Sequence, residues 1–251
     1  MGTAQFRFYE ELNDFLPPHQ KKIDFPHTFL GRNAIKDMIE ALGVPHPEID
    51  LILVNGQSVD FSYIVQDGDQ ISVYPVFEAF DITPLLRLRP TPLRVSRFIL
   101  DVHLGRLARY LRLFGFDTLY RNDYDDAELA RLAGEQRRIL LTRDRNLLKR
   151  SSITHGYYIR ATDPRQQLRE VLARFDLYRS VRSFRRCTQC NGLLTVVVKE
   201  RILDRLGPDT QRYFDRFWMC GDCQRIYWQG SHYERMRHLI EEVLESAGQE
   251  Y

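Results

Sequence analysis

The four cysteines of the chain are the strongest constraint on its fold. They form two Cys-x-x-Cys pairs, Cys187 with Cys190 and Cys220 with Cys223, and 29 residues separate the pairs. No cysteine is left over, and each pair can offer two thiolates to one tetrahedral ion, which favours a four-cysteine zinc ribbon. Because four thiolates close the coordination shell, we expect this zinc to be structural. Two disulfides are the alternative, and a cytoplasmic location disfavours them.

The composition is that of an ordinary folded protein. Of the 251 residues, 43% are hydrophobic and 28% are charged, so we expect packed domains. The N-terminal stretch MGTAQFRFYEEL lacks the apolar core of a signal peptide, and a run of about 18 apolar residues occurs nowhere. The sequence therefore predicts a cytoplasmic protein that spans no membrane. It does not indicate an oligomeric state.

The charges are distributed unevenly along the chain. Residues 1–80 hold 5 Lys and Arg against 12 Asp and Glu, whereas residues 81–251 hold 31 against 22. Of those 31 cations 29 are arginines, whose planar guanidinium binds phosphate through two hydrogen bonds. A GC-rich genome would give the same excess of arginine. The composition therefore permits a nucleic-acid partner without requiring one.

Residues 1–78 are predicted to form a small acidic domain. AQFRFY and KKIDFP predict a first hairpin, residues 33–43 an amphipathic helix, and Asn55-Gly56 between apolar runs a second hairpin, with a final strand after it. This β-β-α-β-β order resembles a ubiquitin-like β-grasp domain of the sulfur-carrier type. A sulfur carrier ends in a free Gly-Gly, whereas here the last strand continues into more chain. We therefore expect a scaffold, or a docking site for a protein partner.

The remainder of the chain divides into a linker and two further domains. Residues 79–96 contain three prolines and no lasting period, which is typical of a linker. In residues 97–178, RFIL, DTLY, RILLT and GYYIR each precede a predicted helix. This alternation predicts an α/β domain, a parallel sheet with helices on both faces. Residues 179–251 hold the zinc ribbon and a C-terminal helix.

Aspartates follow every predicted strand of the α/β domain. The carboxyl ends of parallel strands share one edge of a sheet, where such folds bind ligands. Crowded carboxylates hold hard cations such as Mg²⁺ or Mn²⁺, which suit phosphodiester hydrolysis. The alternative is helix capping, because aspartate is a favoured N-cap residue. In chain order the aspartates are Asp101, Asp123, Asp125, Asp126, Asp144 and Asp163.

Cations accompany these acids. Arg106, Arg109 and Arg112 are spaced three apart on the helix predicted after Asp101, so they line one side of it. Such cations hold phosphates without reading sequence. A plain solvated face is the alternative. Arg143, Arg145 and Lys149 surround Asp144 and would extend the same surface.

The motifs together resemble one known family. FILDVHLGRLARYLRLFGFDT, DDAELARLA, RILLTRDRNLL, the CTQC and CGDC pairs and RIYWQGSHYERM are similar to the Mut-seven C-terminal RNase domain, a PIN-like nuclease family with a zinc ribbon. A branch of that family has a ubiquitin-like domain in front, as here.

Other α/β families fit the sequence less well. The acid patterns of phosphotransfer receivers and of haloacid-dehalogenase-type phosphatases do not occur, and neither does a nucleotide-binding glycine motif.

The resemblance implies a metal-dependent ribonuclease. Asp101 and Asp144 match the regular acids of the family, and Asp126 is the helix-borne partner. Asp163 or Asp123 could supply a fourth acid. The resulting hypothesis is that these acids hold Mg²⁺ or Mn²⁺ for attack on RNA, while arginines such as Arg106, Arg109, Arg143 and Arg145 position the strand.

A non-catalytic alternative stays open at this point. A protein with the same zinc ribbon and arginines, but without a working metal site, would be an RNA-binding or ribosome-associated adaptor. The sequence does not indicate which RNA is bound, whether DNA is accepted, or whether cleavage is internal or terminal.

Overall fold

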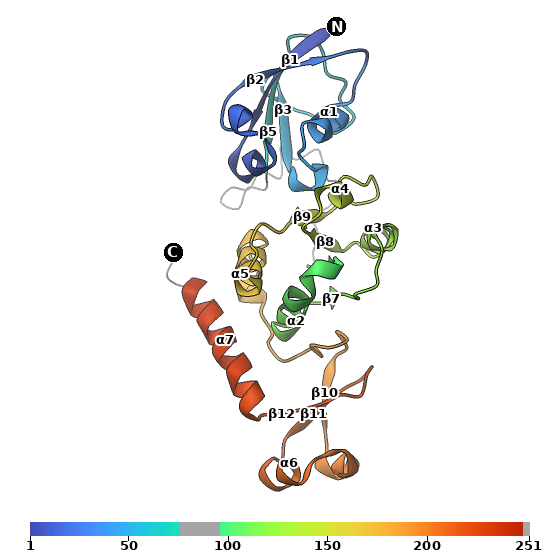
Figure 1. Ribbon diagram of the computed structural model, residues 1–251, viewed down its shortest axis with the longest axis vertical. Coiled ribbons are helices and arrows are strands. Elements are labelled where there is room, and N and C mark those ends of the chain that lie inside the picture. The colour runs from blue at the N-terminus through green and yellow to red at the C-terminus, as the bar shows by residue number, and fades with distance from the viewer. Residues whose placement is uncertain (76–95, 248–251) are drawn as a thin grey trace. The chain divides into compact units, whose positions relative to one another are not determined.

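The N-terminal part of the chain folds around a five-stranded sheet (Figure 1). The computed structural model describes residues 1–75 and 96–247. The strand order is β2-β1-β5-β3-β4, with β1 and β5 parallel and the other neighbours antiparallel, which is the predicted β-grasp arrangement. The elements are β1 (Gly2–Phe8), β2 (Phe25–Phe29), α1 (Ile35–Ala41), β3 (Leu51–Val54), β4 (Gln57–Ser58) and β5 (Gln70–Tyr74), with 3-10 helices η1 (Glu10–Phe15), η2 (Pro18–Gln20) and η3 (His46–Glu48).

Alternation and turn chemistry explain this part of the fold. Alternate residues of β1, including Phe6 and Phe8, are buried in a core that α1 covers with Ile35 and Ile39. The turn between β3 and β4 has positive φ angles at Asn55 and Gly56, 50° and 81°, as a two-residue hairpin turn requires. The second predicted hairpin and the predicted helix are therefore confirmed. The first is confirmed in its antiparallel pairing, but only Phe25 and Pro26 of the predicted KKIDFP segment lie in β2.

The central part is a parallel sheet flanked by helices. Its strand order is β7-β6-β8-β9. All residues of β6 and β8 are buried, as expected when helices cover both faces. The elements are β6 (Phe98–Leu100), the 3-10 helix η5 (Val102–Leu104), α2 (Gly105–Leu113), β7 (Thr118–Leu119), α3 (Asp126–Glu135), β8 (Ile139–Thr142), α4 (Arg145–Leu148), β9 (Gly156–Tyr158) and α5 (Pro164–Arg174).

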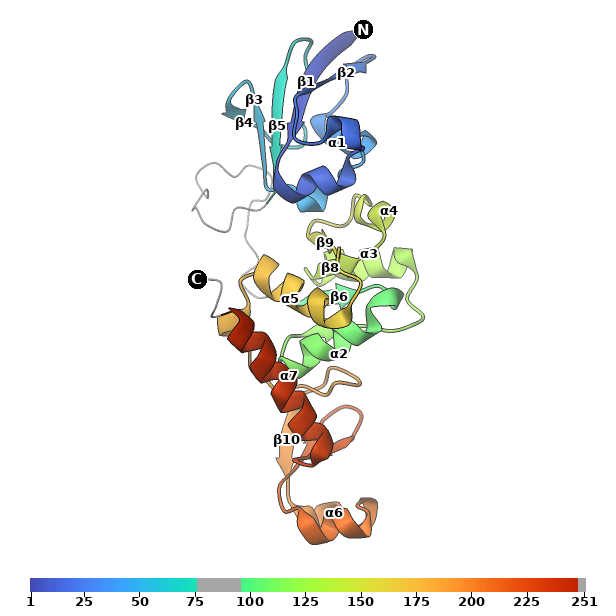
Figure 2. The ribbon, with the colours of Figure 1, turned by 60° about the vertical axis from the view of Figure 1, so that its left-hand side comes forward.

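The C-terminal part is a three-stranded antiparallel ribbon followed by a long helix. Its core contains Val197, Ile202, Leu206 and Phe217. Figure 2 shows helix α7, in red, beside α5, and two ion pairs join these helices. The elements are η6 (Tyr178–Ser180), β10 (Leu194–Val197), η7 (Lys199–Arg201), η8 (Leu203–Arg205), α6 (Pro208–Tyr213), β11 (Phe217–Cys220), β12 (Ile226–Trp228) and α7 (Ser231–Ala247).

The described residues form two compact units. One contains residues 1–75 and 125–158, and the other contains residues 96–124 and 159–247. The predicted linker at 79–96 lies outside the described residues apart from Ser96.

Length and apolar character together decide whether a helix can cross a bilayer. In the described residues, no helix combines the two.

Candidate functional site

The four cysteines converge on one point of the ribbon. Their Sγ atoms all lie within 4.8 Å of one another, with Cys190 and Cys220 3.3 Å apart and Cys187 and Cys223 3.6 Å apart. These separations are too long for disulfides of about 2.05 Å. They suit four sulfurs around an ion with Zn–S bonds of about 2.3 Å. The four residues therefore form a candidate metal centre that could hold zinc.

The two cysteine turns are built by local hydrogen bonds. Cys187 N donates to Gly192 O at 2.8 Å, and Asn191 N donates to Cys187 O at 2.9 Å. The second turn has the equivalent of the Asn191–Cys187 bond, because Gln224 N donates to Cys220 O at 3.1 Å. Asn191 and Gln224 both have positive φ angles, 76° and 58°. Each turn thus directs two thiols to the same side of the ribbon.

The surroundings shift the pKa values of Cys187, Cys190 and Cys223 in different directions. Burial acts to raise the pKa of Cys187, but hydrogen bonds from the Tyr227 hydroxyl, at 3.0 Å, and from the backbone N–H groups of Cys190 and Gln189 lower it to about 7. Burial raises the pKa of Cys190 to about 12, and it also raises that of Cys223. Four thiolates so close together need a cation between them, and a zinc ion would supply its charge.

Arg112 connects the first cysteine turn to the parallel sheet. Its side chain is 3% exposed, and burial lowers the pKa of its guanidinium. Nε donates to Thr118 O at 2.9 Å, and Nη1 donates to Gln189 O at 2.7 Å. Arg112 therefore does not belong to the solvated or phosphate-binding row that its spacing predicted.

Asn191 makes a second connection between the same two elements. Its Oδ1 accepts from Thr118 N at 2.9 Å, and its Nδ2 donates to Asp117 Oδ1 at 2.9 Å. Since Thr118 begins β7 and Asp117 directly precedes it, the first cysteine turn is fixed to this strand as well as to α2.

Arg112→Lys is expected to destabilise the zinc-loaded protein by about 2–4 kcal/mol. An ammonium cannot reproduce the planar fork, and each buried carbonyl left unpaired costs about 1–3 kcal/mol. Denaturant unfolding measures the loss. Arg109→Lys is the matched control, because Arg109 lies on the same helix and is exposed. Equal stability of the two variants would contradict the structural role of Arg112.

Asp101 and Asp144 each begin a helical turn. Asp101 follows β6, is 4% exposed, and accepts a hydrogen bond from His103 N at 2.8 Å. Asp144 follows β8, and its Oδ1 accepts from Asn146 N at 2.7 Å and from Leu147 N at 3.4 Å. The capping alternative is thus confirmed for both carboxylates. Both capping bonds of Asp144 go to Oδ1, so capping does not exclude a second role for this carboxylate.

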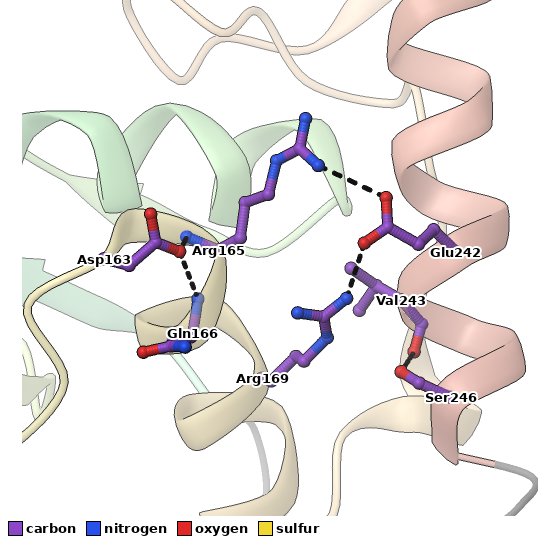
Figure 3. A network of polar contacts seen from close by, with 7 residues as sticks. All are labelled: Asp163, Arg165, Gln166, Arg169, Glu242, Val243 and Ser246. Carbon is purple, nitrogen blue, oxygen red and sulfur yellow. Dashed lines mark hydrogen bonds and ion pairs between the residues drawn. The ribbon is translucent and has the colours of Figure 1, made fainter.

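Asp163 caps α5 in the same way. Figure 3 shows its carboxylate accepting from the backbone of Arg165 and Gln166, at 3.0 and 3.1 Å. The guanidinium groups of Arg165 and Arg169 reach Glu242 of α7, at 3.3 and 2.7 Å. These ion pairs fasten α7 to the helix that Asp163 begins.

The acids before α3 are more exposed. Asp125 caps α3 through Glu128 N at 2.7 Å. Asp126 is the first residue of the helix, with the nearest oxygen 3.8 Å from Arg150 Nη2. Asp123 pairs with Arg121, and the hydrogen bond from that guanidinium lowers the pKa of Asp123.

A metal ion needs several ligand atoms close together. Within the described residues, the four cysteines are the one group of three or more Cys, His, Asp or Glu side chains whose ligand atoms lie close enough to hold an ion. The predicted metal-binding role of Asp101, Asp126, Asp144 and Asp163 stays a prediction.

The candidate phosphate-binding arginines lie in different surroundings. Arg106 and Arg109 are exposed on α2. Arg143 is half-buried directly after β8. The role of all three with nucleic acid stays a prediction.

Two stretches of the chain match known protein families. Residues 96–240 match the family described as the Mut7-C RNAse domain, and residues 1–81 match the Mut7-C ubiquitin family. The chain belongs to the Mut7-C RNAse domain family. The resemblance predicted from the sequence motifs is thereby confirmed, and so is the ubiquitin-like N-terminal domain. No curated protein and no solved structure matches the chain.

Membership of the Mut7-C RNAse domain family indicates nuclease activity with RNA as the partner. The Mut7-C ubiquitin domain indicates protein interaction.

The Mut7-C ubiquitin domain contacts the α4–β9 region, which lies in the same compact unit. Arg145 Nη2 donates to Asp14 O at 3.3 Å, and its guanidinium lies over the rings of Phe15 and Tyr158, at 5.0 and 5.4 Å. Lys149 Nζ donates to Glu40 O at 2.7 Å. Two cations predicted for phosphate binding thus have protein contacts that the sequence does not indicate. The role of Arg145 with RNA stays a prediction.

Helix η3 of the Mut7-C ubiquitin domain supplies the buried part of this contact. Glu48, which is fully buried, accepts a hydrogen bond from Tyr158 N. His46 Nε2 lies 2.8 Å from Ile153 O, and its Nδ1 lies 2.6 Å from Glu40 Oε1. Both ring nitrogens of His46 therefore face an oxygen acceptor. No motif in the sequence marks these residues.

Proposed function

We propose that the chain is a metal-dependent ribonuclease with a PIN-like domain over residues 97–178. Asp101, Asp126 and Asp144 would hold Mg²⁺ or Mn²⁺, and Asp163 is the candidate fourth ligand. The cysteine cluster would hold zinc in a structural role. The observation that carries the proposal is that acids follow the strands of one parallel sheet, with Asp101 directly after β6 and Asp144 two residues after β8. A cytoplasmic location stays a prediction.

The strand order supports this choice of site. In the order β7-β6-β8-β9, the chain runs in one direction from β6 to β7 and in the other from β8 to β9. Open α/β sheets bind ligands outside the carboxyl ends of the strands at such a change of direction. Asp101 directly follows β6, and Asp144 follows β8 by two residues. These acids are therefore the first candidates for the ligands.

The donor set fits a hard divalent ion. Mg²⁺ and Mn²⁺ prefer carboxylate oxygens and water. Asp144 and Asp163 accept their capping hydrogen bonds through Oδ1, so coordination through Oδ2 is compatible with the caps. A bound ion would lower the pKa of a water molecule and stabilise charge on the phosphate. The caps hold the carboxylates in place before the substrate arrives.

The arginines of α2 would hold the RNA backbone. Arg106 and Arg109 are exposed on the helix that begins shortly after Asp101. Their contribution would be independent of sequence and sensitive to salt, because phosphates are their targets.

Purified, zinc-loaded protein is expected to cleave end-labelled single-stranded RNA when Mn²⁺ or Mg²⁺ is added, and to leave it intact when neither is added. The products on a denaturing gel report the cleavage, and labels at both ends distinguish internal from terminal attack. RNA that is bound but not cut under all metal conditions would contradict the proposal and support the non-catalytic adaptor.

A further inference from the structure

The two faces of the zinc ribbon differ in composition. Phe217, Met219 and Ile226 lie on the inner face, within or against the ribbon core. Side chains alternate across a strand, so Trp218 and its cross-strand partners lie on the opposite, outer face. On one side of Trp218 the partner is Val196, and on the other it is Tyr227.

At its β10 edge, the outer face presents apolar side chains to water. The side chain of Val196 is 77% exposed, and that of Val198, which follows the strand on the same side, is 56% exposed. Trp218 is half-buried, and Tyr227 bonds to Cys187. Trp218 is therefore an aromatic ring at the centre of an outer face that water reaches, whereas Phe217 beside it is buried.

By strand register, three arginines fall on the same face as this ring. Arg225 lies opposite Cys220, and Arg216 lies two residues before Trp218. Arg185 lies opposite Leu194, next to the bridge between Arg186 and Leu193. Each of the three is exposed, and none makes an ion pair within the described residues.

Two acids near the ribbon pair with other cations. Asp215 pairs with Lys199 at 2.8 Å. Asp215 lies two residues before Phe217 and Lys199 two residues after Val197, so strand alternation puts both on the inner face. Asp117 pairs with Arg186. The three arginines are thus cations without an ion-pair partner in the described part of the ribbon, and we name Val196, Val198, Trp218, Arg185, Arg216 and Arg225 the ribbon platform.

We propose that the ribbon platform binds single-stranded RNA, with a base stacked on Trp218 and phosphates held by the three arginines. An aromatic ring among guanidinium groups suits unpaired bases, because stacking needs a free base face and the backbone supplies the negative charge. A purely apolar partner would leave the three guanidinium groups without counter-charges. The inference rests on the proposed function only in choosing RNA as the nucleic acid.

Fluorescence of Trp218 tests the platform directly. The chain has two tryptophans, so Trp228→Phe leaves Trp218 as the single emitter. Titration of this full-length, zinc-loaded variant with oligouridine, without added Mg²⁺ or Mn²⁺, is expected to quench the emission to saturation. The same RNA as a duplex with oligoadenosine is expected to quench it far less. Unchanged emission, or equal quenching by the duplex, would overturn the proposal.

Affinity provides a second readout. Fluorescence anisotropy of labelled oligouridine is expected to show about 10-fold weaker binding by Trp218→Leu and near-normal binding by Trp218→Phe. Unchanged binding is expected for Trp228→Phe, because Trp228 is 38% exposed but, opposite Phe217, lies on the other face from Trp218. Replacing Arg185, Arg216 and Arg225 with Gln is expected to reduce the slope of log affinity against log salt by about 2. Zinc content and circular dichroism of each variant show that the ribbon is intact.

The outcomes separate this inference from the proposed function. If Mn²⁺-dependent cleavage occurs while Trp218→Leu binds RNA normally, the platform is excluded and the ribonuclease stands. If Trp218 is quenched by RNA that no metal condition causes to be cut, the platform stands and the ribonuclease is excluded.

Discussion

Asp144→Asn is expected to lower the rate of Mn²⁺-dependent RNA cleavage by about 100-fold or more while leaving the protein folded. Asn Oδ1 can accept the same hydrogen bonds from Asn146 N and Leu147 N, and Asn caps helices as well as Asp does. The amide carries no charge, so it is a poor ligand for a hard cation. Loss of several kcal/mol of metal-derived stabilisation corresponds to a factor of this size.

Asp125→Asn is the matched control for this substitution. Asp125 also caps a helix, accepting from Glu128 N at 2.7 Å, and its substitution removes the same charge without touching a proposed ligand. Initial rates over a range of Mn²⁺ concentrations, together with thermal unfolding, are measured for both variants. Cleavage by Asp144→Asn at the wild-type rate would remove Asp144 from the proposed site. An equal loss in Asp125→Asn would show that the rate responds to charge in general.

Local patterns were sufficient to predict most strands and helices of the β-grasp and parallel-sheet parts. Alternation in β1, the Asn55-Gly56 pair and the apolar face of α2 are decided by residues close in sequence, because backbone geometry sets their periods. The two Cys-x-x-Cys pairs are also local sequence patterns. Their spacing already places two thiols on each turn, and the structure brings the turns together.

Arg112 shows where such reasoning fails. Residues three apart on a helix differ by about 60° in direction, so Arg106, Arg109 and Arg112 turn progressively around α2. By the third position the row has reached the edge of the apolar face, next to buried Ala108. The carbonyl of Gln189 that receives Arg112 is 77 residues away in sequence, and no local pattern specifies it.

Arg145 and Glu48 were missed for a related reason. Arg145 stands between Asp144 and Asn146, and Glu48 between Pro47 and Ile49, and neither setting indicates the contact that the side chain makes. The partner of Arg145, Asp14 O, is 131 residues away, and the partner of Glu48, Tyr158 N, is 110 residues away. Tertiary contacts of this range depend on how the β-grasp part and the α4–β9 region pack. They became visible only in the folded chain.

Removing the metal from the cysteine cluster is expected to unfold the ribbon and to loosen the start of β7. The ribbon core is small, and binding of structural zinc contributes on the order of 10 kcal/mol in comparable sites. Because Arg112 and Asn191 join the first cysteine turn to Thr118, the loss should reach the parallel sheet. Chelation, or Cys220→Ser, is expected to abolish protection from hydrogen exchange in β10–β12 and to reduce it in β7. A protected, metal-free ribbon would contradict the zinc assignment.

The pH dependence of zinc affinity provides a sharper test of the same centre. In the metal-free protein the pKa of Cys187 is lowered to about 7, so above that pH this thiol is already ionised and releases no proton on binding zinc. Below it, one more proton must leave, and the slope of log affinity against pH should rise by about one. Tyr227→Phe removes the hydrogen bond that lowers this pKa, so the change of slope should move to higher pH. Competition with a chromophoric chelator measures both, and a change of slope at the same pH in the two proteins would show that Tyr227 does not set the ionisation of Cys187.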